Sequence, residues 1–204
     1  MRVVCVFLFT ILLFGSKCPA ADVSDETLLP TWLDQPPNSI LLFGGQFTTV
    51  DFYNSFTPTA PHESNYIVGG AYERDFFQKW GFVFGTEVGV AQRFGMGDST
   101  EGWVGLHVRY SWLVLFNSVR IAPGLTFGLS GITKPVGIEA AREADAQGDA
   151  RLLGYLGPEL AVSFMGVPNL EFVYRIQHRS GALGRLGGMQ EGANANVFGM
   201  RLRF

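Results

Sequence analysis

Long stretches of this chain alternate, residue by residue, between large apolar side chains and side chains that are absent, small or charged. The stretch 80–91 is the clearest, and its apolar members are Trp80, Phe82, Phe84, Val88 and Val90. Glycine, Glu87 and Ala91 occupy most of the positions between them. Successive side chains of a β-strand point to opposite faces, so a period of two predicts strands.

The same period recurs along most of the chain. It is clear in 103–112, 119–129, 152–164, 168–180 and 194–204, and weaker in 40–52 and 65–75. Together with 80–91 these stretches predict eight strands.

The composition of the two faces indicates what surrounds the sheet. One face is large and apolar, in a chain with 47% hydrophobic residues and 18 Phe. The other carries glycines, of which the chain has 26, together with charges of both signs. In a narrow barrel glycine makes room inside, and carboxylates there pair with guanidiniums. The candidates for this pairing are Glu73, Glu87, Glu159, Glu171, Arg109, Arg120, Arg175, Arg201 and Arg203. We therefore predict an all-β fold, an eight-stranded antiparallel transmembrane β-barrel of the outer-membrane type.

The predicted connections agree with this fold. Short links near 77–79, 115–117 and 166–169 alternate with longer ones near 53–64, 93–101, 131–149 and 181–193, as expected for periplasmic turns and external loops. We expect 138–150 to be a mobile surface loop, with a short helical piece as the alternative. Eight strands leave an interior that side chains fill, which excludes a general porin.

The first residues resemble a targeting segment. A basic start at Arg2, an apolar run over 3–14 and small residues at 20–21 predict a cleavable secretory signal over 1–21. Lys17 argues against the alternative, a lipoprotein site at Cys18. We assign 22–39 to a proline-broken N-terminal periplasmic extension and 40–204 to the barrel, integral to the bacterial outer membrane. Both cysteines, Cys5 and Cys18, lie in the signal, so the exported chain has neither disulfides nor a thiol nucleophile.

Charge and histidine content narrow the function classes. Of 15 basic residues, Arg2 and Lys17 lie in the signal, which leaves 13 against 18 acidic ones and excludes nucleic acid as a favoured partner. Three scattered histidines form no metal-ligand cluster, and we expect no metal or cofactor. The predicted partners are outer-membrane lipid and the barrel-assembly machinery during biogenesis. The sequence carries no signal for an oligomeric state.

The segment 173–184, VYRIQHRSGALG, departs from the simple pattern. His178 and Ser180 continue the apolar, outer face of the strand to its external rim, while the charges lie on the inner face. Residues two apart on a strand are separated by about 6.6–6.8 Å, a gap that an imidazole and a hydroxymethyl group can close. The pair can therefore supply a general base and a nucleophile for ester hydrolysis. His107, on the inner face, is expected to be an interior histidine with a satisfied ring, and His62 to be solvated.

The segment from His178 to Phe204 resembles the C-terminal end of the lipid A 3-O-deacylase (PagL) family of eight-stranded outer-membrane barrels. The family pattern is His-x-Ser-Asn, a loop, and Gly-x-Glu at the start of the last strand. The resemblance implies that His178 is the general base, that Ser180 is the nucleophile, and that Gly192 matches the glycine. It implies an esterase that removes a hydroxyacyl chain from lipid A or a related glycolipid, an acyloxyacyl hydrolase-like activity in lipopolysaccharide modification.

Two residues depart from the family pattern. Gly181 stands where the family has Asn, which leaves backbone N–H groups near Gly181 and Leu183 as the candidate oxyanion donors. Asn194 stands where the family has its catalytic Glu, and Glu191 is the nearby carboxylate, so the orienter of His178 is Asn194 by alignment or Glu191 by chemistry. The alternative to an esterase is a non-catalytic barrel with a structural, adhesive or envelope-maintenance role.

Overall fold

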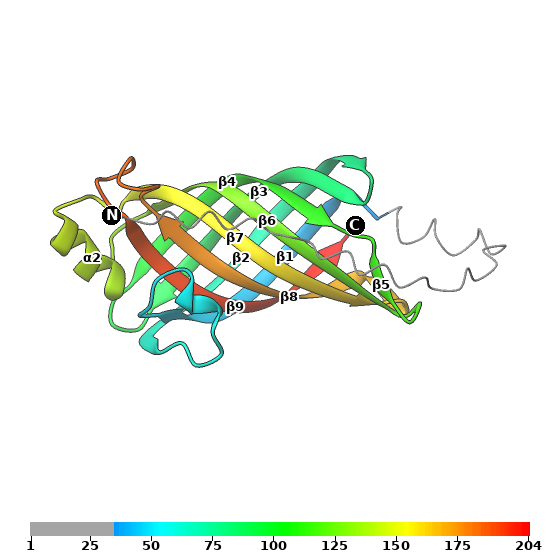
Figure 1. The fold of residues 1–204 in the computed structure, drawn as a ribbon, viewed down its shortest axis with the longest axis horizontal. Helices are drawn as coiled ribbons and strands as arrows, with labels where there is room; N and C mark the ends of the chain where they lie inside the picture. The colour runs from blue at the N-terminus through cyan, green and yellow to red at the C-terminus, as the bar shows by residue number, and fades with distance from the viewer. Residues whose placement is uncertain (1–34) are drawn as a thin grey trace, which may run out of the picture.

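The computed structural model describes residues 35–204, which form one closed antiparallel β-barrel (Figure 1). The strands are β1 (Asn38–Thr48), β2 (His62–Lys79), β3 (Phe82–Phe94), β4 (Ser99–Tyr110), β5 (Leu113–Leu115), β6 (Val119–Ile132), β7 (Leu152–Phe164), β8 (Val167–Ser180) and β9 (Glu191–Arg203). Apart from β4 and β5, neighbours in sequence pair with one another; β1 pairs with β9, and β4 pairs with β6. The three-residue β5 pairs only with β6, at its edge, so the barrel wall has eight strands and the predicted fold is confirmed.

Two parts of the predicted organisation fall at the beginning of the chain. The predicted signal over 1–21, with Cys5 and Cys18, and most of the predicted extension lie outside the described residues. The barrel itself begins at Asn38, two residues earlier than the predicted boundary.

The sheet closes on itself because lipid surrounds it. In hydrocarbon each unpaired backbone N–H or C=O costs several kcal/mol, so a strand edge cannot face lipid. The pairing of β1 with β9, from Ser39↔Arg203 to Thr48↔Asn194, removes both edges. No helix in residues 35–204 is long and apolar enough to cross a membrane.

The outer wall carries the large apolar side chains predicted from the alternation. Leu42, Val88 and Phe198 on three different strands are 63%, 53% and 67% exposed. A soluble protein does not present such a continuous apolar surface, whereas an outer-membrane barrel requires it. This wall and the closed sheet make the protein an integral outer-membrane barrel.

The lumen is filled by a network of arginines and glutamates. Glu159 accepts hydrogen bonds from Arg109 Nε at 3.1 Å, from Arg175 Nη2 at 2.6 Å and from Arg201 Nη2 at 2.7 Å. Arg175 reaches across the barrel to Glu87, and Arg201 reaches to Glu73. All these side chains are buried, so each charge depends on its partners for the solvation that water would otherwise supply.

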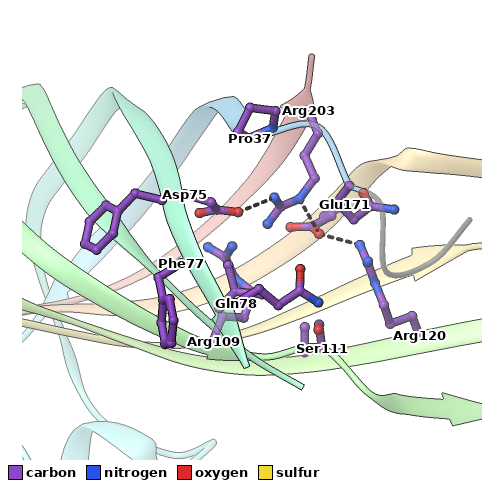
Figure 2. Close-up of a pocket in the computed structure, with 13 residues that line it drawn as sticks. Pro37, Asp75, Phe77, Gln78, Arg109, Ser111, Arg120, Glu171 and Arg203 are labelled. Atoms are coloured by element: carbon purple, nitrogen blue, oxygen red, sulfur yellow. Dashed lines mark hydrogen bonds and ion pairs between the residues drawn. The ribbon is translucent and has the colours of Figure 1, made fainter. Parts of the chain in front are cut away.

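The two ends of the barrel differ. Asn38 and Phe204 lie at one end, here called the terminal end, and the loops 49–61, 133–151 and 181–190 lie at the other, here called the loop end (Figure 1). Near the terminal end a cavity of about 250 Å³ is lined by charged side chains and by apolar ones, among them Phe77 and Val83. Arg203 pairs there with Asp75 and Glu171, and Arg120 pairs with Glu171 (Figure 2). The ion pairs that line this cavity therefore continue the Arg–Glu network of the lumen.

Glycines on the inner face make room for large lumen side chains, as the sequence predicted. Trp103 packs over Gly89, where an added Cβ would lie 2.1 Å from the indole Cζ2 atom. The indole Nε1 donates a hydrogen bond to Glu87 at 2.6 Å. A side chain at position 89 would displace the indole and break this bond.

Two predictions about the loops were wrong. The link predicted around 93–101 is only the four residues 95–98, because β3 and β4 extend beyond their alternating stretches. The stretch 138–150 is not the mobile loop that we preferred but contains helix α2 (Ile138–Ala146), which confirms the alternative of a short helical piece and lies across the loop end (Figure 1).

Buried contacts hold α2 in place. Glu139 in its first turn is fully buried and pairs with Arg93 at 2.6 Å and with Arg179, both from the barrel interior. Glu63 on β2 accepts a hydrogen bond from the Ile138 N–H at 2.8 Å and so caps the helix N-terminus. The sequence of this loop alone does not indicate these partners, because they are distant in the chain.

We predict that Glu159→Gln lowers the free energy of unfolding by about 3–5 kcal/mol, because three buried guanidiniums lose one shared carboxylate charge. Denaturant titration in lipid vesicles measures this loss. Asp145→Asn, at an exposed position of α2, is the control and should change stability by less than about 0.5 kcal/mol. Equal effects of the two substitutions would contradict a stabilising role of the lumen network.

We predict that Gly89→Leu prevents folding or costs about 1–3 kcal/mol or more, because it overpacks the lumen against Trp103. Gly102→Leu is the matched control on the adjacent strand, since an added Cβ there meets only one atom, at 3.9 Å on the outer side. The folded fraction is read from the heat-dependent gel mobility of each variant. Similar folding of the two variants would argue against Gly89 as a space-making residue.

Candidate functional site

His178 and Ser180 occupy the end of β8 at the loop end of the barrel (Figure 1). Both belong to the outward-facing set of this strand, since the charged residues Arg175 and Arg179 and the amide of Gln177 point into the lumen. Ser180 is half-buried, whereas His178 is only 5% exposed. The pair predicted from the alternation thus lies on the outer wall, and its imidazole is covered.

A hydrogen bond joins His178 to Asn194 on the neighbouring strand. The two residues are cross-strand partners of β8 and β9, and His178 Nδ1 lies 2.5 Å from Asn194 Oδ1. The other end of the amide is fixed by Val50, whose carbonyl oxygen accepts a hydrogen bond from Asn194 Nδ2 at 2.9 Å.

This arrangement determines the tautomer of the imidazole. A backbone carbonyl only accepts hydrogen bonds, so the amide atom that faces Val50 is the NH₂ group. The amide oxygen then faces His178, and His178 Nδ1 must carry the hydrogen that it donates. In the neutral ring, Nε2 is left with its lone pair, as a general base requires.

Arg142 of α2 also donates a hydrogen bond to the Val50 carbonyl oxygen that accepts from Asn194. Its Nη2 donates to Val50 O at 3.0 Å, and its Nη1 donates to Gly192 O at 2.9 Å. One guanidinium thus joins α2, the 49–61 loop and β9 beside Asn194. Val50 and Arg142 are 92 residues apart, and no motif in the sequence links them.

The 49–61 loop folds over the outer wall and covers the imidazole. Phe52 lies against His178, with ring centroids 4.3 Å apart and planes inclined by 37°. Short-range hydrogen bonds hold this loop, among them Asn54 N–H to Asp51 Oδ1 and Ser55 Oγ to Asp51 O. Thr48 and Asn194 beneath the loop are fully buried. The predicted strand over 40–52 included Phe52, but β1 ends at Thr48, and Phe52 lies in the loop that follows. Its contact with His178 is therefore not indicated by the alternation of the sequence.

An irregularity in β9 sets the position of Glu191. His178 pairs with Asn194 but Ser180 pairs with Glu191, so β9 has one extra residue between the two pairs. This β-bulge brings Glu191 opposite Ser180, although its residue number has the inner-face parity. Glu191 is therefore the first residue of β9 and not a loop residue that reaches back to His178. Its buried Oε2 has no hydrogen-bond partner among residues 35–204.

The structure places the two candidate orienters differently. Asn194 contacts the imidazole, and Glu191 lies beside the serine without a hydrogen bond to His178 in the described part of the chain. Ser180 Oγ likewise has no hydrogen bond to His178 within residues 35–204. Catalytic hydrogen bonds are often long in the absence of substrate and tighten in the complex.

The candidate oxyanion donors also differ from each other. Gly181 N–H donates to Gln190 O at 3.2 Å, and Gly181 O accepts from Leu186 N–H at 2.8 Å, so the prediction that its N–H is available does not hold in this conformation. An added Cβ at Gly181 would lie 1.9 Å from Met189 O, which explains why this loop needs glycine there. Leu183 has φ of 63° and is 91% exposed at the loop tip, and its N–H has no backbone partner in the described chain.

The other two histidines lie away from this site. His107 is buried in the lumen, as predicted, and its Nε2 lies 2.7 Å from Asp75 Oδ1, but within residues 35–204 its ring is satisfied at this nitrogen alone. Its Nδ1 has no partner within the described residues. His62 is exposed at the start of β2.

Comparisons with known proteins extend only to the fold. No family model matches the chain, and no curated protein matches its sequence. Among solved structures, Neisserial surface protein A (NspA) superposes with a TM-score of 0.52 at 11% identity, over 82% of this chain and 97% of that one. The outer membrane enzyme PagL has a TM-score of 0.49 at 10% identity, over 81% and 99%. The N-terminal β-barrel domain of Pseudomonas aeruginosa OprF has a TM-score of 0.47 at 10% identity, over 83% and 98%. The likeness to NspA is evidence for the fold alone, and the chain is an eight-stranded outer-membrane β-barrel.

Proposed function

We propose that this protein is an outer-membrane serine esterase that removes an ester-linked hydroxyacyl chain from lipid A or a related glycolipid. The observation that carries the proposal is the hydrogen-bond series from Val50 O through the Asn194 amide to His178 Nδ1. It prepares Nε2 as a base on the outer wall, two residues from Ser180. The resemblance of the segment from His178 to the lipid A 3-O-deacylase family supports the substrate class.

The proposed reaction has two steps. Ser180 Oγ attacks the ester carbonyl while His178 Nε2 takes its proton, and the imidazolium then gives that proton to the departing sugar oxygen. The acyl group is now on Ser180, and a water activated by the same imidazole releases it as a fatty acid. Neither step needs a metal or a cofactor.

The chemistry of Asn194 limits how far it can assist the imidazole in proton transfer. An asparagine orients the ring, as in Cys-His-Asn enzymes, but it has no charge with which to stabilise the imidazolium. Glu191 lies opposite Ser180 and is the nearby carboxylate on β9. We infer that Asn194, which contacts the imidazole, orients His178, and that Glu191, which has no hydrogen bond to it among residues 35–204, does not.

A non-catalytic barrel is the alternative function. It is favoured by the covered imidazole, which is 5% exposed under Phe52, and by the hydrogen bond that engages Gly181 N–H. Under this alternative the segment 178–194 would join β8, β9 and the 49–61 loop without reacting.

We predict that lipid A from cells that express this protein loses the mass of one hydroxyacyl chain, and that Ser180→Ala and His178→Ala abolish the loss. Mass spectrometry of extracted lipid A measures it. His62→Ala, at an exposed histidine, is the matched control and should leave the loss unchanged. Unaltered lipid A in cells that contain folded, inserted wild-type protein would support the non-catalytic alternative.

We predict that Asn194→Ala lowers kcat at least about 100-fold with little change in KM, because the base loses its fixed tautomer. Glu191→Ala should lower kcat less than about tenfold, since another residue holds the imidazole. Steady-state kinetics of the purified, refolded variants measure both. A larger loss for Glu191→Ala than for Asn194→Ala would reverse the assignment of the orienter.

A further inference from the structure

We propose that the cavity near the terminal end binds a small carboxylate, whose charged group lies at Arg109 and whose apolar part packs against Val83 and Ala122. All three residues line this cavity of about 250 Å³. The cavity lies at the opposite end of the barrel from His178 and Ser180, so the proposal does not depend on the esterase (Figure 1).

An unused donor on Arg109 is the main support for this site. Arg109 Nε donates to Glu159 Oε1 at 3.1 Å, and Nη2 donates to Glu73 Oε2 at 2.8 Å. Arg109 Nη1 is also buried, but it has no hydrogen-bond partner among residues 35–204. The whole residue is only 2% exposed, and a buried charged donor without an acceptor is costly. An acceptor oxygen in the cavity would remove this cost.

Arg203 offers a second donor to the same cavity. Its Nε donates to Glu171 Oε1 at 3.0 Å and its Nη1 donates to Asp75 Oδ2 at 2.9 Å, whereas its Nη2 makes no hydrogen bond within residues 35–204. A carboxylate has two oxygens and can accept from two donors at once. Since Arg109 and Arg203 both line the cavity (Figure 2), each oxygen of one ligand carboxylate would have its own donor.

The charges around the cavity favour a ligand with one negative charge. Three guanidiniums, of Arg109, Arg120 and Arg203, and two carboxylates, of Asp75 and Glu171, line it together. Arg109 is also paired with carboxylates deeper in the lumen. A phosphate dianion would therefore meet two like charges without a matching excess of positive charge, and such contacts are costly. A carboxylate monoanion meets the same donors with half the charge.

Apolar side chains beside the donors define the rest of the ligand. Val83 on β3 is the cross-strand partner of Arg109, and Ala122 lies on β6. Both are buried, at 8% and 2% exposure. The cavity is smaller than the about 300–1,000 Å³ of sites for drug-sized molecules. The ligand class is therefore a small carboxylic acid with a compact apolar body.

The test uses 4-fluorobenzoate as the probe and 4-fluorobenzamide as its neutral counterpart of nearly the same shape. We expect refolded protein in zwitterionic detergent micelles at neutral pH to bind the benzoate saturably, with Kd on the order of 1 mM. Titration of the fluorine resonance measures binding, with empty micelles as the blank. The benzamide should bind at least about tenfold more weakly, because it lacks the charge-assisted hydrogen bonds. Inorganic phosphate at the same concentration should not displace the benzoate.

Two variants connect the binding to the cavity. Arg109→Lys keeps the charge but removes Nη1, and it should weaken binding at least about tenfold. Because Arg109 also belongs to the lumen network, Val83→Phe is a second variant, which fills the cavity and changes no ionisable residue. It should weaken binding by at least as much. Val88→Phe lies on the same strand but on the outer wall, where Val88 is 53% exposed, and this matched control should bind as the wild type does.

Several outcomes would overturn the proposed site. They are wild-type protein that binds no benzoate, equal affinity for benzoate and benzamide, displacement by phosphate, and folded Val83→Phe that binds as tightly as the wild type. None of them would bear on the esterase, which the lipid A measurement tests separately.

Discussion

Charge buried inside a narrow barrel is the constraint on which the rest of this structure depends. A wall of eight strands that faces lipid must turn its apolar side chains outward, and the polar ones then fill a lumen without bulk water. Glu159 accordingly contacts Arg109, Arg175 and Arg201 at once. Each charge is tolerated only because its partners replace water, so the network fixes the relative positions of strands that are distant in sequence.

The same constraint reaches the outer wall through helix α2. Glu139 enters the lumen to meet Arg93 and Arg179, which fixes the helix across the loop end. One turn later, Arg142 emerges beside β9 and holds Val50 O, which in turn orients the Asn194 amide. The ion pairs inside and the hydrogen bonds that orient the imidazole outside are therefore connected by one short helix.

Asn194 gives this site a particular chemical character. It fixes the ring nitrogen that bears hydrogen, but in the proposed reaction it would not offset the positive charge that develops on the imidazole. The β-bulge places Glu191 opposite Ser180. In the proposed esterase the fold therefore supplies the geometry of the site, whereas Asn194, the residue that orients the histidine, supplies no charge.

The sequence by itself determined the barrel, the strand count, the face of most strand residues and the place of His178 and Ser180, because side-chain alternation is a local property that lipid outside and charge inside enforce. It left the helix in 133–151 as an alternative to a mobile loop, and it did not determine the four-residue link at 95–98 or the roles of Val50, Phe52 and Arg142. It also left the choice between Asn194 and Glu191 open. These features arise from contacts between segments far apart in the chain, such as Arg142 with Val50, and from a bulge that shifts register by one residue. Only the closed tertiary structure brings such segments together, because no local pattern encodes which loops meet at the end of a barrel.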